Sequence, residues 1–272
     1  MGTRRLAIGG DFRYTATIAT PAVVQVAPLG GAGVTIEVEQ WYLDPPQDTH
    51  EYRDIYHNRC HRMVLPAGRS SFGYQALVTV PDATEDADFA APEWAPDALP
   101  DDVLVYLVPS RYCLPDMLGH EAWARFSHMT PGYGRVAAIC QHVHDHLQFA
   151  YGSSSPTSTA VDVNSSGFGV CRDFTHLAIT FCRALNIPAR YVFGYLPDLD
   201  VPADPAPMDF AAWMEVWLGD RWWTFDPRNN RRRKGRVLIG RGRDASDVAM
   251  VTSFGGPHLD SMSVIAREVE PG

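Results

Sequence analysis

The chain has 272 residues, of which 46% are apolar, and a formal net charge of -9. This length suggests about two domains, and the acidic balance gives no electrostatic footprint for nucleic acid or for an anionic membrane. No apolar run reaches the roughly 18 residues that a membrane-spanning helix needs, and the opening residues lack the apolar core of a signal peptide. We therefore expect a globular, cytoplasmic protein that binds neither nucleic acid nor membrane.

The cysteines do not form a recognisable framework. Five are present, scattered along the chain: Cys60, Cys113, Cys140, Cys171 and Cys182. Their odd number and the absence of a CxxC pair argue against both a disulfide scaffold and a zinc finger.

The first part of the chain has the pattern of a β domain. Between Phe12 and Pro81, short segments rich in β-branched and aromatic residues alternate with Pro, Gly and Asp turns, which predicts an antiparallel β-sandwich. The acidic, Pro- and Ala-rich segment from Asp82 to Asp102 is interpreted as a surface linker. We therefore predict two domains, residues 1–100 and 101–272.

The second part begins with helical periodicity. Apolar residues recur every three or four positions in Asp116–His128 and Arg135–Ala150, which predicts two helices. His142 and His146 share one helical face, but no HExxH pattern or third ligand accompanies them, so we expect no metal and no other cofactor. The polar stretch GSSSPTSTAVDVNSSG, residues 152–167, is interpreted as a loop.

The stretch from Gly167 to Arg190 is the centre of the predicted site. Two glycines lead into Cys171, and apolar residues then recur at helical spacing, so Cys171 begins a helix. The unpaired N–H groups of a first helical turn favour a thiolate, which predicts a lowered pKa for Cys171 and an N–H group available to an oxyanion. The alternative is a thiol that serves only in packing.

The strands that follow predict a second half of the site. After a central strand around residues 189–196, a hairpin turns at Gly219-Asp220. With Leu218 opposite Arg221, residues Ala211 and Asp226 become diagonal neighbours on one face, roughly 7 to 8 Å apart.

Two further segments complete the chain. The basic run RRRKGR, residues 231–236, is interpreted as a solvated loop rather than a recognition patch, because it stands alone in an acidic chain. The closing segment from Ser263 is interpreted as a last edge strand.

The sequence GVCRDFTHLAITFCRALNIPARYVFGY, followed by DFAAWMEVWLGDRWWTFDPRNN, resembles the transglutaminase-like superfamily, in particular its bacterial members regarded as candidate cysteine proteases. The resemblance covers Ala138 to about Val248, and the β-rich beginning is similar to their N-terminal domain. It implies an α+β, papain-like core with a Cys-His-Asp triad. Cys171 falls on the nucleophile and Asp226 on the orienting acid. The His of the family's D-x-H-A-W pattern falls on Ala211.

The alanine at the triad base position is the main departure from the family. Alanine can neither accept the thiol proton nor protonate a leaving amine, and Asp226 is expected to face an empty space. Three explanations fit: an engineered change, a natural loss, or a base from elsewhere, with His176 nearest in sequence. A spacing of five residues turns His176 away from Cys171 on a helix, so we expect His176 either to pack in the core or to support residues of the site from behind.

Two functions are consistent with these residues. The first is acyl transfer by Cys171 from a peptide or protein amide, either a peptide bond or a glutamine side chain, to water or an amine. The second is a catalytically inactive module that binds peptide or protein on the same fold. In either case Trp213, Glu215 and Arg172 are candidates for the walls of the site, Trp213 for contact with substrate. The oligomeric state is left open.

Overall fold

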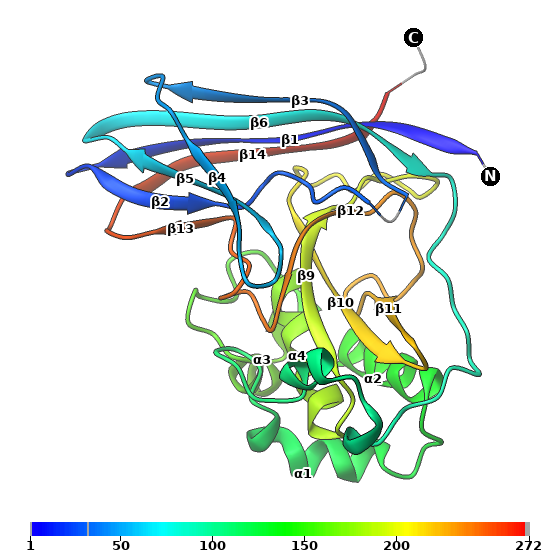
Figure 1. Cartoon of the computed structure of the whole chain (residues 1–272). Coiled ribbons are helices and arrows are strands. Elements are labelled where there is room, and N and C mark those ends of the chain that lie inside the picture. The colour runs from blue at the N-terminus through cyan, green and yellow to red at the C-terminus, as the bar shows by residue number, and fades with distance from the viewer. Residues whose placement is uncertain (1, 32, 270–272) are drawn as a thin grey trace.

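The structure, a computed structural model, describes residues 2–31 and 33–269. Figure 1 shows a β-sandwich at the top of the molecule and, below it, a domain in which helices pack against a second set of strands. This arrangement confirms the predicted fold class, a β-rich N-terminal region followed by a mixed α/β core.

The sandwich contains two antiparallel sheets. The first has the order β14-β1-β6-β3, with bounds Thr3–Ala16 for β1, Thr35–Asp44 for β3, Gly68–Pro81 for β6 and His258–Glu268 for β14. The second has the order β13-β2-β5-β4, with bounds Thr20–Val24 for β2, His50–Arg53 for β4, Arg59–Leu65 for β5 and Val251–Ser253 for β13. Alternate residues of β1, such as Leu6 and Ile8, are buried between the sheets, as the two-residue period of a strand requires.

The core domain is built on a third antiparallel sheet of order β11-β10-β9-β12. Its strands are β9 (Ala189–Tyr195), β10 (Ala211–Leu218), β11 (Arg221–Phe225) and β12 (Val237–Gly242). Its helices are α1 (Pro115–Phe126), α2 (Tyr133–His146), α3 (Ala160–Ser166) and α4 (Cys171–Ala184), preceded by the 3-10 turns η1 (Pro96–Ala98) and η2 (Asp101–Tyr106). A short parallel pair, β7 (Gln148–Phe149) and β8 (Phe168–Gly169), joins the ends of α2 and α3.

Helix α4 is the element around which the core domain packs. It contacts the other three helices and the sheet strands β9 and β10, and its residues from Asp173 to Arg183 are all buried. Truncating a large buried side chain such as Phe174 to alanine would cost about 3 to 5 kcal/mol. The helix begins at Cys171, as the sequence predicted.

Two predicted elements differ from the structure. Helix α2 ends at His146 rather than at Ala150, because the chain continues as strand β7. The expected loop at 152–167 contains helix α3, whose start is fixed by a capping box: the Thr159 amide donates to the Asp162 carboxylate at 2.9 Å, and the Asp162 amide donates back to the Thr159 hydroxyl. Gly167 ends the helix at φ 75°, a left-handed conformation that favours glycine.

The hairpin of β10 and β11 has the predicted register. Leu218 lies opposite Arg221, and Met214 lies opposite Phe225, with Gly219 and Asp220 in the turn. The count from the turn therefore places Asp226 just beyond the last paired residue of β11.

The end of the chain returns to the sandwich. In Figure 1 the orange and red segment leaves the core domain and enters the upper sheets, where β13 pairs with β2 and β14 pairs with β1. Strand β14 lies at the edge of its sheet, as the sequence predicted. The boundary near residue 100 stays a prediction. Within residues 2–31 and 33–269, none of the helices combines the length and apolar character needed to cross a bilayer.

Candidate functional site

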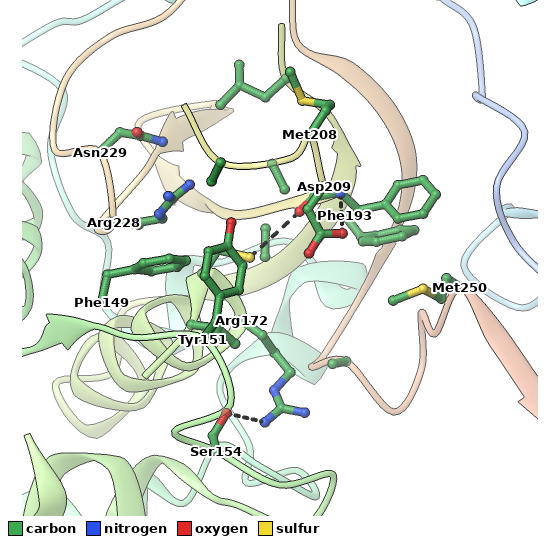
Figure 2. Close-up of a pocket in the computed structure, with 18 of the residues that line it drawn as sticks. Phe149, Tyr151, Ser154, Arg172, Phe193, Met208, Asp209, Arg228, Asn229 and Met250 are labelled. Atoms are coloured by element: carbon green, nitrogen blue, oxygen red, sulfur yellow. Dashed lines mark hydrogen bonds between the residues drawn. The ribbon is translucent and has the colours of Figure 1, made fainter. Parts of the chain in front are cut away.

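A pocket of about 750 Å³ lies where helix α4 meets the beginning of strand β10. Its wall includes Cys171, Ala211 and Ala212, together with residues of the loop after β7 and of the turn after β11. Figure 2 shows the aromatic rings of Phe149 and Tyr151 on one side of this pocket and Met250 on another. The structure therefore brings Cys171 and Ala211, which are 40 positions apart, to one cavity.

The Cys171 sulfur lies against the backbone that leads into β10. Its Sγ is 3.9 Å from the carbonyl oxygen of Phe210, the residue before Ala211. The chain before α4 lies close to the first turn of the helix, since a Cβ on Gly169 would lie only 2.8 Å from the Cβ of Asp173. The Asp173 carboxylate accepts from the Val170 amide at 2.9 Å and caps the helix.

The predicted lowering of the Cys171 pKa is wrong for the protein as it stands. Burial raises the pKa of the Cys171 thiol to about 11, and the charges of Asp209 and Asp226 add to this effect. The guanidinium of Arg228 and the backbone amide of Ala212 act in the opposite direction without cancelling it. The sequence could not predict this outcome because desolvation depends on the surrounding fold, whereas the helix terminus is a local feature.

Ala211 is half-buried and contributes to the pocket wall. No histidine is found among the described residues that line this pocket. The structure therefore holds no imidazole beside Cys171 in the part of the chain that it describes.

Asp226 does not face an empty space, and that expectation is wrong. Its Oδ1 accepts the backbone amide of Asn229 at 2.9 Å, and its Oδ2 accepts the Asn229 side-chain amide at 2.8 Å and Nη2 of Arg236 at 2.7 Å. Burial raises the pKa of Asp226, but the Arg236 charge and these hydrogen bonds outweigh it, so the net pKa lies below its usual value. The carboxylate is a buried, charged and partnered group.

Arg236 links this corner to the segment that connects the two domains. Its guanidinium also binds the carboxylate of Glu85 and lies over the ring of Trp213, 4.8 Å from the ring centroid. The interpretation of residues 231–236 as a solvated loop is therefore wrong for part of the run. Arg233 is buried against Asp198, and Lys234 pairs with two aspartates.

The other candidate wall residues occupy different places. Arg172 lines the pocket and holds the loop above it through the carbonyl oxygen of Ser155. Glu215 is buried in an ion pair with Arg190 and Arg241. Trp213 is only 2% exposed and packs beneath Arg236. It is not one of the described residues that line the pocket.

The three histidines considered in the sequence analysis differ in burial: His176 is buried, His142 is half-buried and His146 is exposed. His176 lies between the rings of Tyr112 and Tyr191, and its Nε2 accepts the backbone amide of Ala245 at 3.1 Å. Burial lowers the pKa of His176 to about 3, so its ring is neutral. These contacts confirm the packing role predicted for His176. His142 similarly packs on Phe126.

Among the pocket residues that sequence reasoning did not identify are three polar or charged ones: Asp209, Arg228 and Asn229. Arg228 and Asn229 lie in the turn after β11, beyond the last pair of the hairpin, Phe225 with Met214. Their position directly after Asp226, in the sequence DPRNN, was the signal that could have indicated them. Asp209 precedes β10, and its carboxylate accepts the amide of Phe210 at 2.7 Å.

Comparison with known proteins agrees with this arrangement. The model of the transglutaminase-like superfamily matches residues 123–227. The crystal structure of a candidate cysteine protease from Cytophaga hutchinsonii is 29% identical in sequence and superposes with a TM-score of 0.89, covering 100% of this chain and 93% of that one.

Two curated relatives are themselves uncharacterised. A protein of Mycobacterium leprae is 33% identical over 139 residues, and one of Mycobacterium tuberculosis is 37% identical over 114 residues. The matches cover 48% and 38% of this chain, and 50% and 36% of those proteins. This chain therefore spans half of the first relative and about a third of the second. Taken with the fold, the family match establishes that residues 123–227 of this chain belong to the transglutaminase-like superfamily.

Proposed function

We propose that this chain is a cysteine-dependent acyl-transfer enzyme that acts on amide bonds of peptides or proteins, with Cys171 as the nucleophile. One observation supports this more than any other. The sulfur at the start of α4 faces a pocket next to the beginning of β10, where the family's histidine position falls on Ala211. A thiol that served only in packing would need no adjoining cavity of this size.

The chemistry proceeds in two steps. The Cys171 sulfur attacks the amide carbonyl carbon, the C–N bond breaks, and the amine leaves with a proton, so that the acyl group is held as a thioester. Water or a second amine then attacks the thioester carbonyl and releases the thiol. In the first step the backbone N–H of Cys171, in the first helical turn, is available to the developing oxyanion.

The alanine at position 211 leads us to expect a slow reaction in the protein as it stands. With the pKa of Cys171 at about 11, the sulfur is a thiol at neutral pH and needs a base to take its proton. Alanine offers none. We therefore expect this chain to bind amide substrates and to turn them over slowly.

The Asp226 carboxylate can accept one more hydrogen bond, for example from a histidine. A carboxylate has about four acceptor sites, and the hydrogen bonds from Asn229 and Arg236 use three of them. One acceptor site, on Oδ1, is therefore left, and we propose that an imidazole at position 211 would be oriented through it. Arg236 competes for the same charge and would weaken that interaction.

The test is the substitution Ala211→His. A positioned general base contributes about 100-fold to 10,000-fold, so we expect amide hydrolysis or transfer to rise by at least about 100-fold. The assay uses a panel of fluorogenic peptide amides with water or a primary amine as acceptor, and mass spectrometry of the intact protein for the thioester. The matched control is the double variant Ala211→His with Cys171→Ala, in which the gain should vanish.

Two results would count against the proposal. One is a folded Ala211→His variant that stays inactive over the whole panel. The other is activity that survives the loss of Cys171. The first result would leave binding without turnover as the function.

A further inference from the structure

The guanidinium of Arg228 has hydrogen-bonding capacity that its own chain does not use. Its closest carboxylate is that of Asp204, with Nη2 and Oδ2 3.6 Å apart, which is too long for a hydrogen bond. Within residues 2–31 and 33–269, the structure shows no acceptor within hydrogen-bond distance of any of its five N–H donors. Its side chain is nevertheless only 28% exposed and lines the pocket of Cys171.

Contacts other than the long ion pair with Asp204 also hold Arg228 in place. Its guanidinium carbon lies 4.0 Å from the centroid of the Phe149 ring, which Figure 2 shows beside it. Its backbone oxygen forms a hydrogen bond with Nδ1 of His144 at 2.8 Å, which connects the turn to helix α2. Stacking on a ring fixes the plane of a guanidinium while leaving its N–H edge free. Arg228 is therefore positioned in advance for a ligand.

The charge of the pocket differs from that of the protein. Four arginines and three aspartates line it, with no lysine, glutamate or histidine among the described lining residues, whereas the whole chain carries -9. The acidic residues are Asp198, Asp204 and Asp209, and Asp198 is already paired with Arg233. Arg172 is also paired, with Asp173 outside the lining, so the charges around the pocket nearly balance. The pocket therefore lacks the negative charge of the rest of the protein, which would repel an anionic ligand.

The other arginines of the lining have different positions. Arg172 donates to the Asp173 carboxylate and to Ser155, and Arg233 donates to Asp198. Arg231 is exposed at the pocket rim. Arg228 alone among the four combines a half-buried position with an unused donor edge in the described structure. Arg228 lines the same pocket as Cys171, and its charge lowers the pKa of the Cys171 thiol against the effect of burial.

We propose that Arg228 is a specificity residue that binds a carboxylate of the substrate, so that the preferred substrate is a peptide with a carboxylate group close to the amide that Cys171 attacks. The planar N–H edge of arginine matches a carboxylate with two parallel hydrogen bonds. The aromatic rings of Phe149 and Tyr151 supply the apolar part of the same pocket. The inference rests on the proposed function for the attacked amide, but the carboxylate contact itself requires no turnover.

Direct binding tests this proposal, because the chain with Ala211 should bind peptides and cleave them only slowly. The probes are four versions of one N-acetylated tetrapeptide with two phenylalanines. Its third residue is glutamate or glutamine, and its C-terminus is a free acid or an amide. Binding is followed by NMR titration of the ¹⁵N-labelled protein at low salt and again at high salt.

We expect the carboxylate forms to bind about tenfold to a hundredfold more tightly than the fully amidated peptide, as charge-assisted hydrogen bonds do. The substitution Arg228→Gln should remove that preference, and Arg62→Gln, on the exposed face of β5, should leave it unchanged. Comparing the glutamate peptide with the free-acid peptide distinguishes a side-chain carboxylate from a C-terminal one.

Three outcomes would overturn the proposal: equal binding of all four peptides, no binding of any of them at millimolar concentration, or a preference that survives Arg228→Gln but disappears in Arg231→Gln. The proposed function fails separately. A carboxylate preference in a protein whose Ala211→His variant stays inactive would leave Arg228 a binding residue without an enzyme. If the Ala211→His variant were active but treated the carboxylate and amide peptides alike, the enzyme would lack this specificity.

Discussion

Two arginines in the core domain lie over aromatic rings but have different partners. Arg236 lies over Trp213 and binds two carboxylates, Glu85 and Asp226, in a corner with little solvent access. Arg228 lies over Phe149 at the pocket of Cys171 and has one loose ion pair. A buried charge whose partners are all internal supports the fold, whereas a positioned charge with unused donors is suited to a ligand. The difference separates the structural side of this site from its binding side.

The largest expected effect tests the structural side. The substitution Arg236→Met leaves two carboxylates, Glu85 and Asp226, without their cation, and their side chains are only 14% and 2% exposed. Breaking such a buried pair by removing one partner typically costs about 3 to 5 kcal/mol. Urea unfolding followed by circular dichroism measures this loss.

The matched control is Arg125→Met on helix α1, where the ion pair with Glu121 is exposed. An exposed pair of this kind is worth less than about 1 kcal/mol. If Arg236→Met were no more destabilising than Arg125→Met, the corner around Asp226 would not be a structural centre and the comparison would fail.

The contrast between the two arginines also explains what the sequence could predict. The start of α4 at Cys171 and the register of the β10–β11 hairpin follow from local rules, namely apolar spacing and a two-residue turn. The contact between Arg236 and Glu85 does not follow from local rules, because Glu85 lies 151 positions away in the connecting segment. Because Arg236 belongs to the basic run RRRKGR, the sequence indicated that it is solvated. Only the folded chain shows that its side chain is 8% exposed.

The same reasoning applies to the cysteine. Glycines, the helix terminus and the family resemblance identified Cys171 and Asp226, and the geometry of the pocket was needed to find that burial dominates the thiol. Helix α3 was missed for a related reason. Its Ser- and Asn-rich composition suggested a loop, whereas the capping box at Thr159 and Asp162 was a readable signal of a helix start.

The next effect concerns the pocket side and its pH dependence. Because the folded-state pKa of Cys171 is about 11, the thiolate is the minor form at neutral pH, and less than about one molecule in a hundred carries it at pH 8.5. We expect the rate of alkylation by iodoacetamide to rise about tenfold per pH unit up to pH 9.5 without a plateau. Mass spectrometry of the peptide that contains Cys171 measures this rate separately from the four buried cysteines.

A plateau near pH 8 or below would contradict this prediction and would mean that the helix terminus outweighs burial. The substitution Ala211→His provides a useful contrast, since a neighbouring imidazolium favours the thiolate and should move the plateau to lower pH. Denatured protein, in which all five cysteines titrate near about 8.5, is the reference.

The smallest expected effect completes the comparison of the two arginines. The substitution Arg228→Met removes the charge from a side chain that makes no short ion pair in the described structure, and methionine keeps the contact with the Phe149 ring. We expect the free energy of unfolding to change by less than about 1 kcal/mol, because the substitution removes only a partly exposed ion pair with Asp204 and one cation–π contact. The same urea experiment that measures Arg236→Met measures this variant. A loss of stability as large as that of Arg236→Met would show that Arg228 supports the fold, and its unused donors would then be no argument for a ligand.

A small loss of stability would instead support a binding role for Arg228. In that case we also expect slower alkylation of Cys171 in Arg228→Met, because the nearby positive charge has been removed.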